Sequence, residues 1–263
     1  MIEILVVNAG LIVAAMLALW AVSVRIRDVS FIDAVWPMGM VLLAVSTYLQ
    51  SDGSEDRKFL LLAITALWGL RLGIHLLLRW RREGEDKRYK KIMARNMEKR
   101  GWSWAKVSLI QVFAMQTVLL YIVCLPAVLG QIPAEPATTG WLAFAGKCLA
   151  LIGIGFETIG DMQLERHRNN PAMAGKVLDT GLWRYTRHPN YFGDACVWWG
   201  LWLIAAETSL GLWSVLGPIT ITWLLTRLSG VPMLEHGLKK TRPGYEDYVR
   251  RTSGFFPWPP KSQ

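Results

Sequence analysis

Long apolar runs constrain this chain more than any other feature of its sequence. A bilayer core about 30 Å thick is crossed by about 20 mostly apolar residues in a helix. Runs of that kind occur near 3–24, 31–50, 58–79, 107–130, 140–162, 191–207 and 209–227. Hydrophobic residues make up 52% of the 263 residues and charged residues only 19%, a balance too apolar for an ordinary soluble domain. The sequence therefore predicts an all-α, polytopic integral membrane protein with seven transmembrane helices.

The basic residues are concentrated in alternate connecting segments. These segments are 25–30, 79–106, 164–190 and 227–263. They hold 2, 11, 5 and 7 Lys and Arg residues, which is 25 of the 29 in the chain. The opposite loops, 51–58 and 131–139, hold only Arg57 and Lys58. Because cytoplasmic loops carry the excess of basic residues, we expect the N terminus outside and the C terminus in the cytoplasm. The short chain without a retention signal favours a bacterial inner membrane as the location.

Several function classes find no support in the sequence. The net charge of +9 is spread over loops rather than along one amphipathic stripe, so nucleic acid is not an expected partner. The three cysteines lie inside apolar runs without CxxC spacing, so neither a disulfide framework nor a metal site is expected. No GxGxxG follows a strand and no GxxxxGK[ST] occurs, so a nucleotide would have to be held by helices and side chains.

Ionisable residues inside the apolar runs are the informative ones. Each costs at least about 2.5 kcal/mol at mid-helix unless it is paired or faces water. Asp33 shares a helix face with Trp36 and Pro37. Trp68, Arg71 and His75 follow helical spacing on the third run, and Glu157 and Asp161 do so on the fifth. Trp36 and Trp68 lie deep in their runs, where they are candidates for packing against a flat ligand.

Two interpretations of these charges are open. In the first they form structural ion pairs, Asp33 with Arg71 and Asp161 with Arg168. In the second they line a hydrated, cytoplasm-facing cavity, which accounts for their concentration at one depth on three helices. The loop 80–104 follows the third run, and its lysine-rich second half is expected to touch anionic lipid.

The stretch GLWRYTRHPNYFGD, residues 181–194, carries the densest set of binding groups. Arg184, Arg187 and His188 offer cationic donors, and Asn190 offers an amide. Two tyrosines supply stacking faces. They are Tyr185 and Tyr191. Such a set suits a phosphorylated, aromatic ligand.

This stretch resembles the C-terminal signature of the membrane steroid 5α-reductases and sterol reductases, G-W-W-x-x-x-R-H-x-N-Y-x-G-D. The tail LEHGLKKTRPGYEDYVRRTSGFFP resembles the ending of the same families. FIDAVWP and LWGLRLGIHLLLRWRREGEDKRY look like a bacterial branch of that superfamily. The resemblance implies one seven-helix domain over 1–263, with the first four helices on the substrate side and residues 140–263 binding NADPH. It also implies reduction of the Δ4 C=C bond of a 3-oxo steroid, or a similar enone lipid, to the 5α-dihydro product.

The resemblance also implies a set of cofactor-binding positions, which the local residue types extend. They are Arg71, Arg88, Glu157, Asp161, Arg168, Trp183, Arg184, Tyr185, Arg187, His188, Asn190, Tyr191, Asp194 and Glu235. Asp33 falls where the steroid reductases carry a catalytic Glu, and Trp68 aligns with their ketone-binding Tyr. The residue before Asp33 departs from the family pattern, because Ile32 stands where those enzymes have Gln.

Conjugate reduction needs an acid at the ketone oxygen, where negative charge develops as hydride reaches the β-carbon. Asp33 is the first candidate for this acid and Tyr89 the second, with Tyr48 an alternative phenol. Trp36, Trp68 and Tyr48 are the expected substrate-binding residues. A monomer in contact with membrane lipid and a lipophilic substrate is the expected state.

Two other function classes stay open on the sequence. The turn RHPNY is similar to one in the isoprenylcysteine carboxyl methyltransferases, which use S-adenosylmethionine. A small transporter or lipid-binding scaffold would also place charges within the membrane. The longer match through NYFGD, with Asp161 and Arg168 upstream, favours NADPH, because its phosphates call for several arginines.

Overall fold

The computed structural model describes residues 1–228, 235, 237–239 and 241–261. The first half of the described chain is built from α1 Ile2–Ile26, α2 Ile32–Gln50, α3 Glu55–Glu83, α4 Lys87–Arg100, α5 Trp104–Val107, a π-helical turn Ser108–Ala114, α6 Met115–Val123 and α7 Leu125–Leu129. The second half is built from α8 Trp141–Asn169, 3₁₀ turns Pro171–Met173 and Gly181–Arg184, α9 Pro189–Ala205, α10 Ser209–Leu212, a 3₁₀ turn Trp213–Val215, α11 Leu216–Trp223, a π-helical turn Leu224–Leu228 and α13 Tyr245–Arg251. The expectation of an all-α architecture is therefore confirmed for the described residues.

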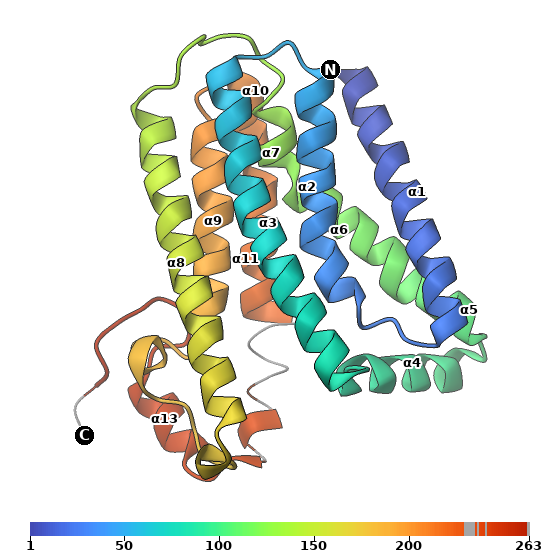
Figure 1. Cartoon of the computed structure of the whole chain (residues 1–263), viewed down its shortest axis with the longest axis vertical. Coiled ribbons are helices and arrows are strands. Elements are labelled where there is room, and N and C mark those ends of the chain that lie inside the picture. The colour runs from blue at the N-terminus through green and yellow to red at the C-terminus, as the bar shows by residue number, and fades with distance from the viewer. Residues whose placement is uncertain (229–234, 236, 240, 262–263) are drawn as a thin grey trace.

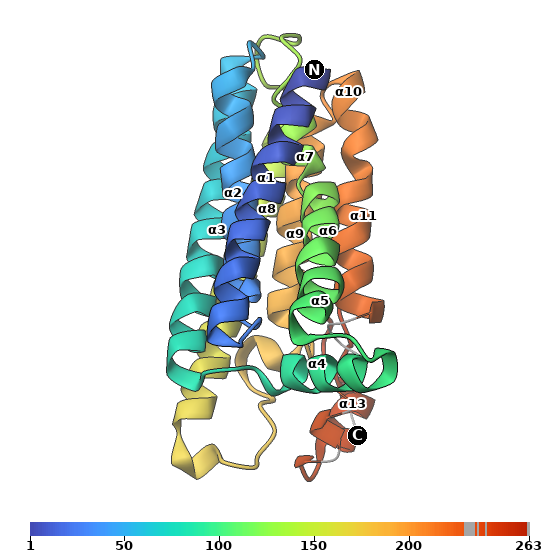
Figure 2. The same ribbon diagram turned by 90° about the vertical axis from the view of Figure 1, so that its right-hand side faces the viewer.

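Most of these helices run along one common axis. Figures 1 and 2 both show α1, α2, α3, α8, α9 and α11 along that axis, whereas α4 lies across one end of the bundle. The N terminus lies at the opposite end from α4 and α13 (Figure 1). Asp86 begins α4, since its Oδ1 accepts a hydrogen bond of 2.7 Å from the backbone N–H of Arg88. The chain thus turns sharply after α3 and places α4 beneath the bundle.

In the part of the chain that the structure describes, six helical segments are long and apolar enough to cross a membrane. They are Ile2–Ile26, Ile32–Gln50, Glu55–Glu83, Trp104–Val123, Trp141–Asn169 and Ser209–Leu228. This confirms a multi-pass membrane protein. Within the described residues, α9 is the remaining predicted span, and it is 17 residues long. Its buried side chains point to several neighbours, as expected of a helix that is enclosed by others rather than facing lipid.

Small residues let α8 and α9 approach closely. A Cβ added at Gly153 would lie 2.5 Å from the carbonyl oxygen of Gly193, and one at Gly200 would lie 2.5 Å from that of Gly146. Glycine at these positions allows the two backbones to touch, which is the usual way that membrane helices gain packing energy. This contact fixes the position of each polar residue of α8 along the bundle axis relative to those of α9.

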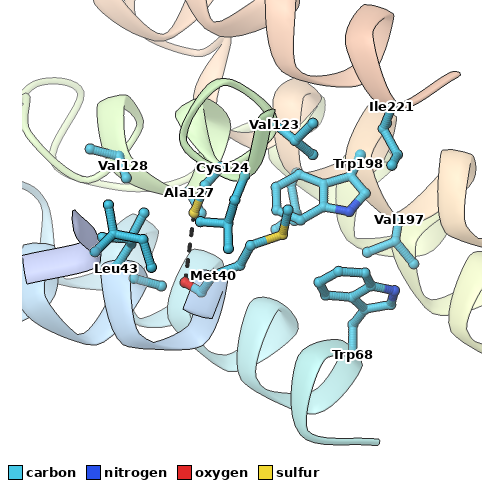
Figure 3. Close-up of a cluster of buried hydrophobic side chains, with 14 of the residues drawn as sticks. Met40, Leu43, Trp68, Val123, Cys124, Ala127, Val128, Val197, Trp198 and Ile221 are labelled. Atoms are coloured by element: carbon cyan, nitrogen blue, oxygen red, sulfur yellow. Dashed lines mark hydrogen bonds between the residues drawn. The ribbon is translucent and has the colours of Figure 1, made fainter. Parts of the chain in front are cut away.

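A dry aromatic core lies beside this contact (Figure 3). Trp68 of α3 meets Trp198 of α9 edge to face, with ring centroids 5.2 Å apart and an interplanar angle of 86°. Both side chains are fully buried. The thiol of Cys124 contacts the carbonyl oxygen of Met40 at 3.6 Å. Trp68, expected to bind substrate, is therefore a core residue.

The end of the bundle away from α4 is held by two polar side chains, the buried Arg57 and the half-buried Glu207. Arg57 donates hydrogen bonds to the carbonyl oxygens of Gly130 and Pro136, each at 2.9 Å, and to that of Pro133. Glu207 Oε1 accepts from the backbone N–H groups of residues 140 and 143, at 2.7 and 2.9 Å, where α8 begins. These contacts join α3, α8 and α9 into one frame.

Candidate functional site

A cavity of about 530 Å³ opens among α2, α3, α4, α6, α8, α9 and the end of α11. One group of lining residues is apolar. It comprises Trp36, Pro37, Leu72, Leu76, Met115, Leu119, Leu164, Ile221, Leu224, Leu225 and Leu228. The other group is polar or ionisable. It comprises Asp33, His75, Arg79, Arg82, Glu83, Asp86, Arg88, Gln116, Glu157, Asp161, Glu165, Arg168, Asn190, Tyr191 and Asp194. The cavity therefore has both an apolar wall and many charged side chains.

Asp33 forms the centre of one polar cluster in this cavity. The Tyr89 hydroxyl donates a hydrogen bond of 2.6 Å to Asp33 Oδ1, and Arg88 Nη2 lies 3.4 Å from Oδ2. Arg88 is itself held by Asp86 at 2.7 Å. The predicted ion pair of Asp33 with Arg71 is wrong, because α4 folds under the bundle and delivers Arg88 and Tyr89 to this carboxylate.

The α4 side of this cluster has a defined protonation state. Burial, reinforced by the negative charge of Asp33, raises the pKa of Tyr89 well above its usual value of 10. Burial disfavours the charged form of Asp86, but the hydrogen bond from Arg88 outweighs it and lowers the pKa of Asp86. Burial likewise disfavours the Arg88 cation, but the hydrogen bond to Asp86 and the charge of Asp33 raise its pKa. Tyr89 is therefore a protonated donor at neutral pH, next to a firmly charged guanidinium.

Arg71 is the centre of the second cluster. Its Nη1 lies 2.8 Å from Asp161 Oδ2, and its Nη2 lies 2.6 Å from Glu157 Oε1. The Asn190 amide donates to Asp161 Oδ1 at 3.1 Å. The predicted ion pair of Asp161 with Arg168 is also wrong, since Arg71 from α3 occupies that carboxylate.

Some polar atoms of the cavity lack partners within the described part of the chain. Asp194 Oδ1 and Glu157 Oε2 are buried and accept no hydrogen bond there. Arg79 and Arg168 line the cavity, and among the described residues neither forms an ion pair or a hydrogen bond. Two cations and two acceptor oxygens are thus available to a ligand.

The signature stretch 181–194 divides between the cavity and the C-terminal segment, of which the structure describes residues 235, 237–239 and 241–261. Asn190, Tyr191 and Asp194 line the cavity. Arg187 Nε donates instead to Glu235 Oε1 at 2.7 Å, and its Nη1 donates to the Thr252 carbonyl at 2.6 Å.

His188 also contacts the C-terminal segment. Its Nε2 lies 3.1 Å from Glu235 Oε1, and its ring stacks on that of Tyr191 with centroids 5.4 Å apart. Burial disfavours ionised Glu235, but hydrogen bonds from His188 and Arg187 outweigh it and lower the pKa of Glu235 to about 2. The C-terminal segment is therefore held behind the cavity wall by a clamp of three side chains, Arg187, His188 and Glu235.

The remaining predicted residues lie away from the cavity. Trp183 is buried, and its Nε1 donates to the Gly160 carbonyl at 3.1 Å. Arg184 and Tyr185 are exposed on the surface of the loop. Tyr48 lies where α2 ends and donates to Glu55 Oε2 at 3.1 Å, so the structure does not bring it to Asp33.

Comparison with known proteins places the chain in a family. The family described as "Protein of unknown function (DUF1295)" matches residues 19–252. The chain belongs to the DUF1295 family. That family is part of the steroid 5α-reductase-like superfamily, which confirms the resemblance found in the sequence and relates this DUF1295 protein to membrane enzymes. An uncharacterized protein of Schizosaccharomyces pombe (strain 972 / ATCC 24843) is 24% identical over 270 residues, which cover 91% of this chain and 75% of that protein. No solved structure matches the chain.

Sequence reasoning missed two kinds of lining residue in this DUF1295 protein. Arg79 continues the stripe of Arg71 and His75 at four-residue spacing, a signal that could have placed it in the cavity. The apolar wall from residues 221–228 carried no such signal, because leucines occur on every face of a membrane helix. Within the described residues, no group of three or more His, Cys, Asp or Glu side chains is arranged to hold a metal ion.

Proposed function

We propose that this DUF1295 protein is an NADPH-dependent oxidoreductase that reduces the C=C bond of a lipophilic enone. A 3-oxo-Δ4 steroid is the candidate substrate, and the 5α-dihydro steroid is the candidate product. The single observation that carries the proposal is the Tyr89–Asp33 hydrogen bond of 2.6 Å. Asp33 lines a cavity that also has an apolar surface and two arginines without partners among the described residues. Acid, anion-binding and apolar groups are the three requirements of this reaction.

The chemistry of the donor set fits NADPH. Unpaired arginines suit phosphate groups, since guanidinium binds phosphate with two parallel hydrogen bonds. Arg79 and Arg168 would hold the phosphates, while Asp194 Oδ1 and Glu157 Oε2 would accept from ribose hydroxyls or the carboxamide. When bound, NADPH supplies the hydride for the β-carbon of the enone.

The chain's own residues would handle the charge and the proton. Negative charge develops on the ketone oxygen as the double bond is reduced, and a hydrogen-bond donor at that oxygen stabilises it. Tyr89 keeps its proton at neutral pH and would be that donor once its O–H turns from Asp33 to the ketone oxygen. A proton drawn from solvent would then add to the α-carbon and complete the reduction. Arg88, 3.4 Å from Asp33, adds positive charge at the same point. Trp36 and the leucines around it would bind the flat apolar substrate and exclude water.

The proposal includes a membrane arrangement. With α9 counted as a central, enclosed span, the bundle has seven spans, and the α4 end with its basic residues faces the cytoplasm. The cavity would then open toward cytoplasmic NADPH, and the N terminus would lie outside. Residues of α8, α9 and the C-terminal segment, together with Arg79 of α3, would serve the cofactor, and those of α2, α6 and the rest of α3 the substrate.

NADPH consumption by detergent-purified protein tests the proposal, with progesterone as the 3-oxo-Δ4 steroid. We expect progesterone-dependent loss of NADPH absorbance in the wild type and in Asp52→Asn, whose exposed carboxylate lies in the loop between α2 and α3. Asp33→Asn is expected to lose that activity. Tight binding of S-adenosylmethionine with no binding or consumption of NADPH would replace the reductase by a methyltransferase.

A further inference from the structure

A second hollow lies at the far end of the molecule from Asp33. It is a groove of about 570 Å³ formed where α2 ends and where α3 and α8 begin. The upper ends of α3 and α8 in Figure 1 mark its position. Its walls carry aromatic rings, acids and one lysine, and none of these residues takes part in the proposed reaction.

Lys147 provides the cation of this groove. It lies six residues after Trp141, about 9 Å along α8 at 1.5 Å per residue, within an apolar membrane span. Its Nζ sits 5.2 Å from the ring centre of Phe144, and among the described residues it has no carboxylate partner. A lysine at this depth extends its ammonium toward the headgroup layer, where a lipid phosphate can neutralise it.

The opposite wall provides a carboxylate that is also unpaired. Glu55 is occupied, since it accepts from Tyr48 at 3.1 Å and pairs with Lys58 at 2.9 Å. Asp56 is exposed and forms no ion pair or hydrogen bond within the described chain. Phe59 beside it is 65% exposed. An exposed carboxylate next to an aromatic face is a suitable site for an ammonium group.

The groove therefore presents separated positive and negative charge at the level of the headgroup layer. We propose that it binds the headgroup of a zwitterionic, amine-bearing phospholipid, with the phosphate at Lys147 and the ammonium at Asp56. The acyl chains have an apolar path along the outer faces of α3 and α8, where Leu67 and Ile152 are more than half exposed. This site is independent of the proposed reductase function.

Lipid binding to delipidated, detergent-purified full-length protein tests the proposal. Native mass spectrometry would measure the dissociation constants of dioleoyl phosphatidylethanolamine and dioleoyl phosphatidylglycerol. We expect wild type to bind one phosphatidylethanolamine about tenfold more tightly than phosphatidylglycerol. Lys147→Gln is expected to weaken binding of both lipids about tenfold. Lys147→Arg, which keeps the charge, is expected to retain binding, and so is Lys91→Gln, an exposed lysine of α4.

The Asp56→Asn variant separates a zwitterionic from an anionic lipid site. It is expected to weaken phosphatidylethanolamine binding about tenfold and to leave phosphatidylglycerol binding unchanged. Equal affinity of wild type and Lys147→Gln for phosphatidylethanolamine would overturn the site. Wild-type preference for phosphatidylglycerol, unaffected by Asp56→Asn, would overturn the amine assignment.

Discussion

The hydroxyl of Tyr89 offers the sharpest test of how the cavity works. Tyr89→Phe removes one oxygen atom and the 2.6 Å hydrogen bond to Asp33, and leaves Asp33 with Arg88 at 3.4 Å. The hydrogen bond that Tyr89 would donate to the developing negative charge on the ketone oxygen contributes about 1.5–3 kcal/mol. Since about 1.4 kcal/mol corresponds to a factor of ten, we expect kcat of the proposed reduction to fall by roughly 10- to 150-fold.

The assay is steady-state NADPH consumption with progesterone at saturating NADPH, together with the dissociation constant of NADPH. That constant should not change, because Tyr89 contacts Asp33 and not the unpaired arginines. Burial raises the pKa of Tyr89 well above 10, so wild type should keep its activity up to about pH 10 without a tyrosinate limb. Tyr185→Phe, an exposed phenol outside the cavity, is the matched control. A kcat for folded Tyr89→Phe within about twofold of wild type would refute the role given to this pair.

Three further outcomes follow from the geometry. Arg168→Gln should raise the dissociation constant of NADPH about tenfold. It should raise that of NADH much less, because the Arg168 guanidinium, which has no partner among the described residues, would bind the phosphate that NADPH has and NADH lacks. Equal effects on the two dissociation constants would contradict this. Gly153→Ala should lower the free energy of unfolding in detergent by more than about 1 kcal/mol, because its Cβ would lie 2.5 Å from a backbone oxygen, whereas Gly155→Ala, with open space, should not. Acidification from pH 4.5 to about 2 should release the C-terminal segment. Because the pKa of Glu235 is lowered in the folded protein, its contacts stabilise the clamp above pH 4.5, and this stabilisation disappears as the carboxylate is protonated. Pepsin cleavage of this segment at pH 4.5 as fast as at pH 2 would contradict it.

The sequence predicted where helices lie better than which residues meet. Each predicted span begins within three residues of a described helical segment, since hydrophobic length determines what can cross a bilayer. The ends were predicted less well, because α8 continues to Asn169, seven residues past the predicted end at 162. The depth of Asp33, Arg71 and Asp161 was also predicted, because it depends only on position along a helix. Their partners were not, because these depend on helix rotation and on the fold of α4 under the bundle.

Trp68 and Arg187 illustrate the same limit. Trp68 lies on the stripe of Arg71, but its indole packs on Trp198 and does not line the cavity. Arg187 stands in a stretch rich in ligand-like groups, yet it holds Glu235 and the backbone of the C-terminal segment. Residue type indicated a ligand contact for both Trp68 and Arg187, whereas in the three-dimensional structure both side chains contact the protein itself.

The contacts of Arg57 make the two ends of the bundle differ in their response to acid. Arg57 is neutralised by the carbonyl dipoles of Gly130, Pro133 and Pro136, which carry no proton to gain. The opposite end relies on the carboxylate of Glu235, which can gain a proton. Acid therefore loosens the Glu235 clamp, whereas the contacts of Arg57 hold no carboxylate to protonate. The loop that Arg57 holds against α3 stays in place while the wall behind the cavity opens.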